Sequence, residues 1–396
     1  MAKILVEDLE DQTRVPFLRG ILIRSLQDAG TPFGEAFAIA SEIRNDLNDT
    51  PLISTCDLHG MVLKRLQALG RETVVTRYEQ RNIPLTTQVE QRDGQLQPFS
   101  RLEYQHCLET IGLESSEADH VVQILQHHLL ERHIEVISSS HLSQLTYRYL
   151  RQSRDLGPAV AHRWLVWRDF VNSGRELIFL VGGTAGCGKS TIATLLASRL
   201  DIVRSQSTDM LREVMRTMIP VQLMPVLHES SFSAWKALPG QLQTDGKVSD
   251  AQLIQGYRSQ ADLLSVAIEA VIQRATRESV SLVLEGVHIH PAFMEKLRSE
   301  SDAVVIPVML GVLKRKQLQR RIQGRSTNVP QRRAGRYLKH FDEIWRLQSY
   351  LLSEADQANI PIVSNTSRDK VFREIMRITI DAMAEQFDRT PEAVFS

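Results

Sequence analysis

Residues 177–191 read LIFLVGGTAGCGKST, and this stretch decides the fold. Its five leading apolar residues, bounded by glycines, are typical of a buried strand. Gly183-x4-Gly188-Lys189-Ser190 then matches the complete phosphate-binding loop pattern. The glycines let backbone N–H groups turn inward around phosphate oxygens, and the positive end of the next helix faces the same anion. The stretch therefore predicts a strand, a phosphate-binding loop and a helix in succession.

The side chains of this loop point to a nucleotide with a metal ion. Lys189 is placed to neutralise β- and γ-phosphates, and the Ser190 hydroxyl is a hard oxygen ligand suited to Mg²⁺. We therefore predict ATP and Mg²⁺ as ligands. The expected nucleotide contacts are Gly183, Thr184, Ala185, Gly186, Cys187, Gly188, Lys189, Ser190 and Thr191.

An Asp-x-x-Arg pair follows the loop at the distance of one βα unit. Asp209 and Arg212 lie one helical turn apart at an expected strand-to-helix junction. A carboxylate there can accept a hydroxyl proton, and a guanidinium can clamp an anionic acceptor. The alternative is an N-cap Asp209 with a surface salt bridge to Arg212. The preceding phosphate loop favours the functional interpretation, with both residues in catalysis and acceptor binding.

The next apolar strand, Val280–Leu284, runs into Glu285-Gly286-Val287-His288. Ligands in parallel sheets bind at the carboxyl ends of strands, so Glu285 is a candidate to hold Mg²⁺ or to order the attacking hydroxyl. His288 is a candidate acceptor contact. His290 is read as a loop residue before a proline, and two histidines at this spacing predict no zinc site.

Ser230 and Ser231 stand in a polar stretch between these strands. Their hydroxyls either bond the acceptor or cap a turn.

The segment 314–339 holds ten Lys/Arg and no Asp/Glu. In a nucleotide-dependent transferase such a segment can close over the phosphates as a basic lid, with Arg321 and Arg325 as candidate catalytic residues. A solvated helix face and an RNA-binding patch are the alternatives. The absence of interleaved aromatics before Tyr337 weakens the RNA interpretation.

The N-terminal half repeats itself at an offset of 82 residues. Pro16-Phe17-x-Arg19 falls on Pro98-Phe99-x-Arg101, Gly30 on Gly112 and His59 on His141. Each copy predicts a hairpin, a helix ending at its glycine, a second helix, and a last helix that starts near Ser54 or Ser138.

This repeat resembles the ATP-cone, a small, mostly helical nucleotide-binding regulatory module. The second copy keeps the basic turn of that family as Arg92-Asp93-Gly94, whereas the first has Glu10-Asp11-Gln12 there. For each copy, nucleotide binding and a purely structural role with buried Pro-Phe and solvated arginines both remain open.

The composition argues against several classes of protein. The 396 residues carry 47 Lys/Arg and 47 Asp/Glu, so no global charge attracts nucleic acid or anionic lipid. No apolar run approaches the roughly 20 residues of a membrane span, and three scattered cysteines argue against disulfides. We expect a cytoplasmic protein with a small anionic substrate, no nucleic acid and no membrane partner; homo-oligomerisation stays open.

The ordered C-terminal motifs resemble the 2-phosphoglycerate kinase family. They are Gly182–Thr191, Ser207-Thr208-Asp209-x-x-Arg212, Leu227-His228-x-Ser230-Ser231 with Trp235, and Glu285–His288. The resemblance implies an α/β phosphate-loop kinase with a parallel sheet flanked by helices, which transfers the γ-phosphoryl of ATP to 2-phosphoglycerate to give 2,3-bisphosphoglycerate.

We expect cone-like domains at 1–86 and 87–172 and a kinase domain at 173–396. A kinase of another phosphorylated polyol and a nucleotide-sensing regulator with little turnover are the alternatives.

Overall fold

The computed structural model describes residues 4–7, 14–47, 50–82, 87–132, 134–239, 248–300, 302–328, 334–387 and 389–396. The chain falls into two compact units. The smaller comprises Met1–Glu90, Gly94–Phe99 and Gln126–Ile137, and the larger comprises Gln91–Asp93, Ser100–Leu125 and Ser138–Ser396. The second repeat contributes to both units. The predicted domain boundaries at 86/87 and 172/173 rest on the sequence repeat and on the motifs, and they stay a prediction.

The two repeats have the same order of elements. The first contains β1 (Leu5–Glu7), β2 (Arg14–Pro16), α1 (Arg19–Asp28), α2 (Phe33–Asp46), β3 (Leu52–Ser54), α3 (Thr55–Ala68) and α4 (Glu72–Asn82). The second contains β4 (Gln88–Glu90), β5 (Leu96–Pro98), α5 (Arg101–Thr110), α6 (Ser115–Glu131), β6 (Val136–Ser138), α7 (Ser139–Gln152) and α8 (Gly157–Ser173). Their small sheets have equivalent orders, β2-β1-β3 and β5-β4-β6.

Local signals in the repeats are confirmed where the residues are described. Gly30 and Gly112 follow α1 and α5 with φ of 102° and 88°, as helix-ending glycines do. Ser54 and Ser138 cap α3 and α7 by accepting backbone N–H bonds. The expectation that these helices end each repeat is wrong, because α4 and α8 follow them.

The two repeat arginines have different partners. Arg19 lies over the ring of Phe37 at 4.9 Å, whereas Arg101 pairs with Asp119 at 3.2 Å. Glu10-Asp11-Gln12 lies outside the described residues. The second copy's basic turn joins β4 to β5, with Gly94 at φ 79°.

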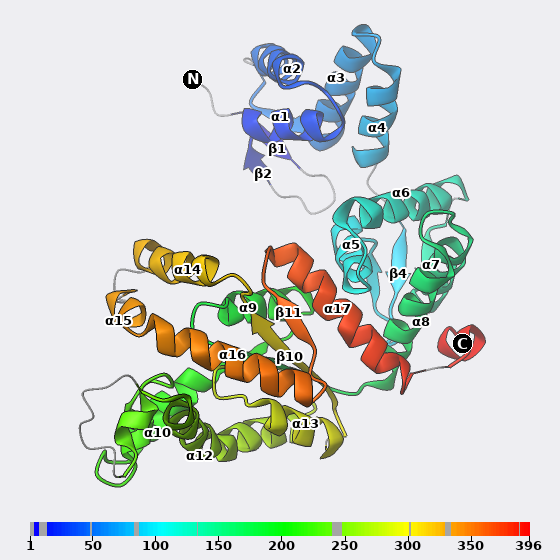
Figure 1. Cartoon of the computed structure of the whole chain (residues 1–396). Helices are drawn as coiled ribbons and strands as arrows, with labels where there is room; N and C mark the ends of the chain where they lie inside the picture. Colours follow the sequence, from blue (N-terminus) through cyan, green and yellow to red (C-terminus); the bar gives the residue numbers. More distant parts are fainter. Residues whose placement is uncertain are drawn as a thin grey trace. The chain divides into compact units, whose positions relative to one another are not determined.

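A five-stranded parallel sheet organises the C-terminal part of the larger unit (Figure 1). Its strands are β7 (Leu177–Gly182), β8 (Arg204–Ser207), β9 (Leu282–Gly286), β10 (Val304–Gly311) and β11 (Ile362–Ser364), in the order β11-β10-β7-β9-β8. The phosphate-loop strand β7 is central and fully buried. Because all neighbours are parallel, the carboxyl ends of the strands meet at one edge.

Helices cover both faces of this sheet, which confirms the predicted fold class. The helices of this region are α9 (Lys189–Arg199), α10 (Thr208–Met218), α11 (Pro225–His228), α12 (Asp250–Arg277), α13 (Pro291–Glu300), α14 (Arg315–Asn328), α15 (Ala334–Lys339), α16 (Phe341–Gln357), α17 (Arg368–Ala384) and α18 (Pro391–Val394), with a 3₁₀ turn η1 (Ala234–Ala237). One apolar core joins α12, α13 and α16 to alternate residues of β7, β9 and β10. On the other side α9 and α17 pack together and against the strands.

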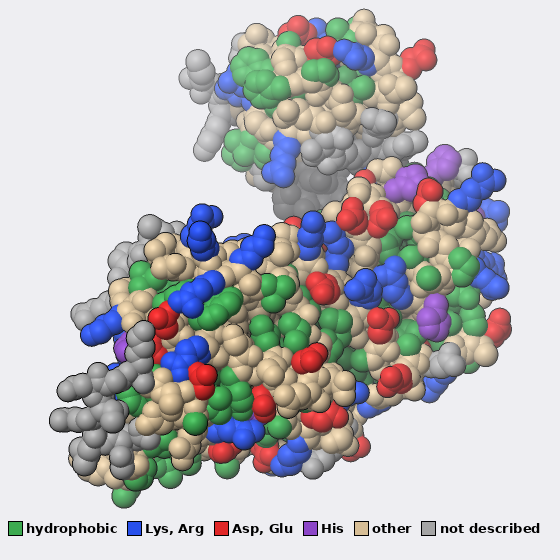
Figure 2. Space-filling model, in the orientation of Figure 1, with side chains coloured by type: hydrophobic (Ala, Val, Ile, Leu, Met, Phe, Trp, Pro, Cys, Tyr) green, Lys and Arg blue, Asp and Glu red, His purple; other side chains and the backbone are tan. Residues whose placement is uncertain are grey.

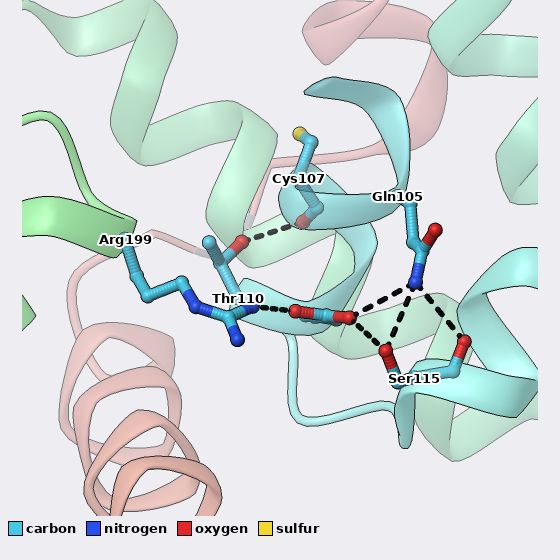
Figure 3. Close-up of polar contacts among 6 residues, drawn as sticks. Gln105, Cys107, Thr110, Ser115 and Arg199 are labelled. Atoms are coloured by element: carbon cyan, nitrogen blue, oxygen red, sulfur yellow. Dashed lines mark hydrogen bonds and ion pairs between the residues drawn. The ribbon is translucent and has the colours of Figure 1, made fainter. Parts of the chain in front are cut away.

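Helix α5 of the second repeat contacts the phosphate-loop helix within the larger unit. Arg199, in the last turn of α9, pairs with the buried Glu109 of α5. Glu109 also accepts hydrogen bonds from Gln105 and Ser115, and Figure 3 shows Arg199 on one side of this cluster with Gln105 and Ser115 on the other. This part of the second repeat therefore packs on the region that carries the phosphate loop. Among the described residues, no helix combines the length and apolarity needed to cross a membrane.

Candidate active site

Three glycines shape the loop between β7 and α9. Gly183, Gly186 and Gly188 have φ of 137°, 89° and 94°, a region that glycine occupies at no steric cost. A Cβ on Gly186 would lie 2.7 Å from Ile322 Cγ1, and one on Gly188 would lie 2.3 Å from Asn365 Nδ2. Glycine is therefore required by the backbone and by the close approach of α14 and the end of β11.

The loop's polar side chains are buried at its centre. Lys189 is 8% exposed, and its Nζ donates to the Thr184 carbonyl at 2.9 Å. The Thr184 hydroxyl is buried without a hydrogen-bond partner in the described part of the chain. An unsatisfied buried donor beside an ammonium group suits a site that binds phosphate oxygens.

Ser190 and Glu285 meet at the same edge of the sheet. The Ser190 hydroxyl donates to Glu285 Oε1 at 2.8 Å, and the Glu285 residue is only 8% exposed. In the register of the sheet, Glu285 lies opposite Val181 of β7 and Ser207 of β8. The predicted metal pair is thus brought together.

The Ser190–Glu285 pair suits a Mg²⁺ ion whose other ligands come from substrate and water, and not a metal held by protein side chains alone. The described residues contain no group of three or more His, Cys, Asp or Glu side chains that could hold a metal. Mg²⁺ prefers oxygen ligands and usually combines one or two protein oxygens with substrate phosphates and water. A hydroxyl and a carboxylate beside a phosphate loop match that ligand set.

Asp209 and Arg212 lie at this edge as well. Helix α10 begins directly after β8, and its N-cap is Ser207, whose Oγ accepts from the Asp209 backbone N–H. Arg212 Nη1 donates to the carbonyls of Leu227 and Glu229 at 3.0 and 2.8 Å. The alternative of an N-cap Asp209 bonded to Arg212 is therefore wrong. Asp209 is exposed, and its carboxylate is available to a ligand.

The register of the sheet relates the start of α10 to the end of β9. Glu285 lies opposite Ser207, two residues before Asp209, and a Cβ on Gly286 would lie 1.7 Å from Thr208 Oγ1. The pKa of His288 is lowered to about 4, chiefly by burial, with Arg212 and Lys189 lowering it and the Asp209 carboxylate raising it. The start of α10 and the end of β9 therefore lie side by side at this edge of the sheet.

His288 itself is placed differently from an acceptor contact. It is 2% exposed, and its two ring nitrogens lie 2.9 Å from Thr208 Oγ1 and 3.0 Å from Gln260 Oε1. His290 bonds Tyr350 and accepts from the Ala292 N–H. The two histidines therefore have separate partners.

Ser230 and Ser231 are half-buried in the turn after α11. The Ser230 carbonyl accepts from the Ser233 N–H, and the Ser230 N–H donates to Ser233 Oγ. Neither the Ser230 nor the Ser231 hydroxyl has a hydrogen bond within the described ranges. A turn held by its backbone leaves both hydroxyls free for a ligand.

The basic segment forms α14 and α15 beside the loop. Ile322 and Leu318 of α14 are buried next to Gly186. Arg321 donates to the carbonyls of Cys187 (3.4 Å) and Asn365 (2.7 Å). Exposed basic residues continue along α14, and Figure 2 shows Lys and Arg side chains over this helix.

Not every predicted lid arginine is described. Arg325 lies on α14, but its side chain is outside the described residues, and Arg332 and Arg333 are outside them altogether.

At the end of α15, Tyr337 packs on Phe232 with ring centroids 5.7 Å apart. The basic segment therefore contacts both the phosphate loop and the turn after Ser230-Ser231.

The sequence motifs assign no role to three polar residues of this region. Asn365 follows β11, and its Nδ2 donates to the Cys187 carbonyl at 2.7 Å. Thr208 and Gln260 bond His288. A signal for Gln260 was present, because it is a polar residue on the apolar stripe of α12 beside Tyr257, Ala261 and Leu264.

Comparison with known proteins finds similar relatives that include three archaeal 2-phosphoglycerate kinases. A 2-phosphoglycerate kinase of Pyrococcus horikoshii is 34% identical over 299 residues, covering 74% of this chain and 95% of that protein. The 2-phosphoglycerate kinase of Pyrococcus furiosus is 34% identical over 301 residues (75% and 95%). That of Thermococcus kodakarensis is 30% identical over 373 residues (94% and 96%). No family model matches the chain.

Overlays on solved structures are weak. A gluconokinase from Sinorhizobium meliloti 1021 gives a TM-score of 0.28 at 15% identity, covering 53% of this chain and 93% of that chain. A shikimate kinase from Bacteroides thetaiotaomicron gives 0.25 at 16% identity, covering 54% and 99%. The fold class therefore rests on the parallel sheet and its phosphate loop.

Proposed function

The chain belongs to the 2-phosphoglycerate kinase family, and from this premise we propose that it transfers the γ-phosphoryl group of ATP to 2-phosphoglycerate. A P–O bond forms to the free hydroxyl oxygen of the acceptor, and the bond from the γ-phosphorus to the bridging oxygen of ATP breaks. The products are 2,3-bisphosphoglycerate and ADP. The observation that supports the proposal is the Ser190–Glu285 hydrogen bond at the carboxyl edge of the sheet, where Glu285 is in register with Ser207, two residues before Asp209.

The loop and its lysine bind the triphosphate. Backbone amides of residues 183–191 and the Lys189 ammonium neutralise the β- and γ-phosphates. The buried Thr184 hydroxyl, which has no hydrogen-bond partner among the described residues, would supply a further donor. Mg²⁺ held by Ser190 and Glu285 would supply charge neutralisation between the phosphate oxygens.

Asp209 and Arg212 serve the acceptor. The exposed Asp209 carboxylate at the start of α10 orients the acceptor hydroxyl and accepts its proton. Arg212 has one guanidinium nitrogen bonded to the 227–229 turn, so it holds that turn, and its other N–H groups would bind an anionic acceptor. Ser230 and Ser231 offer two hydroxyls from the same turn.

Helix α14 covers the nucleotide. Its Arg321 bonds the carbonyl of Cys187 in the phosphate loop, and in the proposed mechanism the guanidinium neutralises charge on the transferred phosphoryl group. Tyr337 of α15 packs on Phe232, next to the Ser230-Ser231 turn. A movement of α14 and α15 over ATP would therefore also act on this turn. Arg325 is proposed to act with Arg321 on the same charge.

The two cone-like repeats add a second, regulatory proposal. Their matching element order supports a common module, and nucleotide binding there would make turnover respond to ATP. Calorimetry on Lys189→Ala separates the sites, since ATP heat that remains must come from the repeats. No remaining heat would refute nucleotide binding by the repeats.

The test is product formation. The protein is incubated with ATP, Mg²⁺ and 2-phosphoglycerate, then with a panel of polyol phosphates, and products are identified by mass spectrometry. We expect a bisphosphate from 2-phosphoglycerate with the wild type and with Lys296→Ala, a control on α13, and none with Lys189→Ala. ATP binding without bisphosphate from any acceptor would overturn the proposal, and bisphosphate from another acceptor alone would reassign the substrate.

A further inference from the structure

Three buried polar side chains form a continuous chain of hydrogen bonds beneath the proposed acceptor site. Thr208 opens α10, His288 follows β9, and Gln260 lies in the middle of α12. All three residues are buried. A buried polar group without a hydrogen-bond partner destabilises the fold. The partners of each polar atom therefore show what these three side chains do.

The partners determine the direction of every bond. Gln260 Nε2 lies 2.6 Å from the Val226 carbonyl and 3.0 Å from the Glu229 carbonyl. Carbonyl oxygens only accept, so this end of the amide must be its NH₂ group, and the other end is an acceptor. Gln260 Oε1 accepts a hydrogen bond from His288 Nε2–H, so Nδ1 of a neutral His288 ring carries no proton and accepts a hydrogen bond from the Thr208 hydroxyl.

The two ends of this chain lie in the two parts of the acceptor site. Thr208 directly precedes Asp209, and its side chain fills the space against Gly286, where a Cβ would lie 1.7 Å from Thr208 Oγ1. At the other end, the Glu229 carbonyl accepts from both Gln260 and Arg212 and is followed by Ser230-Ser231. Two other hydrogen-bonded links join α10 to this turn: Arg212 itself, and His228 Nε2 at 3.0 Å from the carbonyl of Ile219, the C-cap of α10.

We propose that Thr208, His288 and Gln260 are a positioning relay that sets the distance between Asp209 and the Ser230-Ser231 turn, with His288 neutral and protonated at Nε2. The inference rests on the proposed function, because it assigns these residues to the acceptor half of the same site. His288 acts through its neighbours and does not touch the substrate. The relay thus makes the acceptor site rigid before the acceptor arrives.

The surroundings of the ring agree with this assignment. The charged groups that act on His288 are Asp209, Arg212 and Lys189, two of them cations, and burial disfavours a charged imidazole. A neutral ring has one donor and one acceptor, as Gln260 and Thr208 require.

Kinetics of two variants at Thr208 test the relay. Thr208→Val removes the hydroxyl at nearly constant shape and leaves His288 Nδ1 without a donor, so kcat/KM for 2-phosphoglycerate should fall about 10-fold. The KM for ATP should stay within about two-fold. Thr208→Ser restores the hydroxyl and should recover most of the loss, and Thr217→Val, on the exposed face of α10, is the matched control. An equal loss of kcat/KM for ATP and for 2-phosphoglycerate in Thr208→Val would contradict the relay. So would Thr208→Ser if it recovered none of the loss.

A spectroscopic measurement keeps the relay testable apart from catalysis. In a ¹⁵N-histidine-labelled full-length chain, His288→Gln assigns the His288 signals, and long-range ¹H–¹⁵N correlations report which nitrogen carries the proton. We expect a neutral Nε2–H ring at pH 7. An Nδ1–H tautomer or a charged ring would refute the relay even if the enzyme turns over 2-phosphoglycerate. A correct tautomer with no bisphosphate from the wild type would refute the proposed function instead.

Discussion

Replacing Glu109 by Gln tests whether the second repeat is part of the stable core of the larger unit. Glu109 is 7% exposed and accepts from Gln105 Nε2 at 3.2 Å, from Ser115 Oγ at 2.6 Å and from Arg199 at the end of α9 (Figure 3). An amide keeps the shape but removes the charge, so the bond to Arg199 is no longer an ion pair.

The expected loss follows from the burial of the two partners. Hydrogen bonds to charged groups contribute roughly 1.5–3 kcal/mol, against about 0.5–1.5 kcal/mol for neutral pairs. The Arg199 side chain is 30% exposed and recovers part of its solvation. We therefore expect Glu109→Gln to lower the free energy of unfolding of the larger unit by about 1–2 kcal/mol.

Guanidinium unfolding followed by tryptophan fluorescence measures this loss. All four tryptophans, Trp164, Trp167, Trp235 and Trp345, belong to the larger unit, so the signal reports on that unit. The matched control is Glu114→Gln, whose side chain is 61% exposed and pairs with Arg373. The control should change stability by less than about 0.5 kcal/mol. Equal effects of the two substitutions, or no effect of Glu109→Gln, would refute the reasoning.

Three further predictions concern the active-site edge. Gly286→Ala should cost about 1–3 kcal/mol and lower activity, because the new methyl displaces Thr208, whereas Gly60→Ala, with open space around it, should be neutral or stabilising in the same denaturation assay. Folding lowers the pKa of His288 from about 6.5 to about 4, so its contribution to stability is complete above pH 6.5 and falls by up to about 3 kcal/mol towards pH 4. Unfolding titrations should show His288→Gln losing that slope; an identical pH profile would contradict it. Asp209→Asn should reduce kcat about 100-fold or more with the KM for ATP nearly unchanged in steady-state assays, and a parallel rise in that KM would argue against an acceptor role.

The sequence predicts the local parts of the site well. Gly188 and Lys189 are adjacent in one short motif. The strand before this motif and the helix after it follow from apolar periodicity. A capping box also forms at the start of α12, between the N-cap Ser249 and Gln252 three residues later. Such features depend on neighbours along the chain, so one sequence suffices to see them.

Contacts between distant segments could not be predicted in this way. Arg212 bonds carbonyls 15 and 17 residues away, and Asn365 bonds a carbonyl 178 residues away. Backbone carbonyls are present at every residue, so no side-chain pattern marks which of them a guanidinium will find. The partners of His288 on α10 and α12 also come from distant segments, so the position of His288 after β9 does not predict these hydrogen bonds.

The sequence pattern does not predict α4 and α8 of the repeats, for a different reason. Among the α4 residues whose side chains the structure describes, Val74, Val75 and Tyr78 are the buried ones, which is too short an apolar pattern to stand out from a polar stretch. In α8 apolar residues occupy several faces, including Val160, Trp164, Leu165 and Phe170, so no single stripe appears. Both helices are stabilised by packing that the pattern does not encode.

The most direct measurement of the central claim is a ³¹P NMR time course of the full-length protein with ATP, Mg²⁺ and 2-phosphoglycerate. Phosphoryl transfer at the edge where Lys189 and Asp209 meet predicts that the γ-phosphate signal of ATP decays as a second phosphomonoester signal grows on the acceptor, one for one, with ADP as the other product. Decay of ATP to ADP and inorganic phosphate, with the acceptor signal unchanged, would contradict the account.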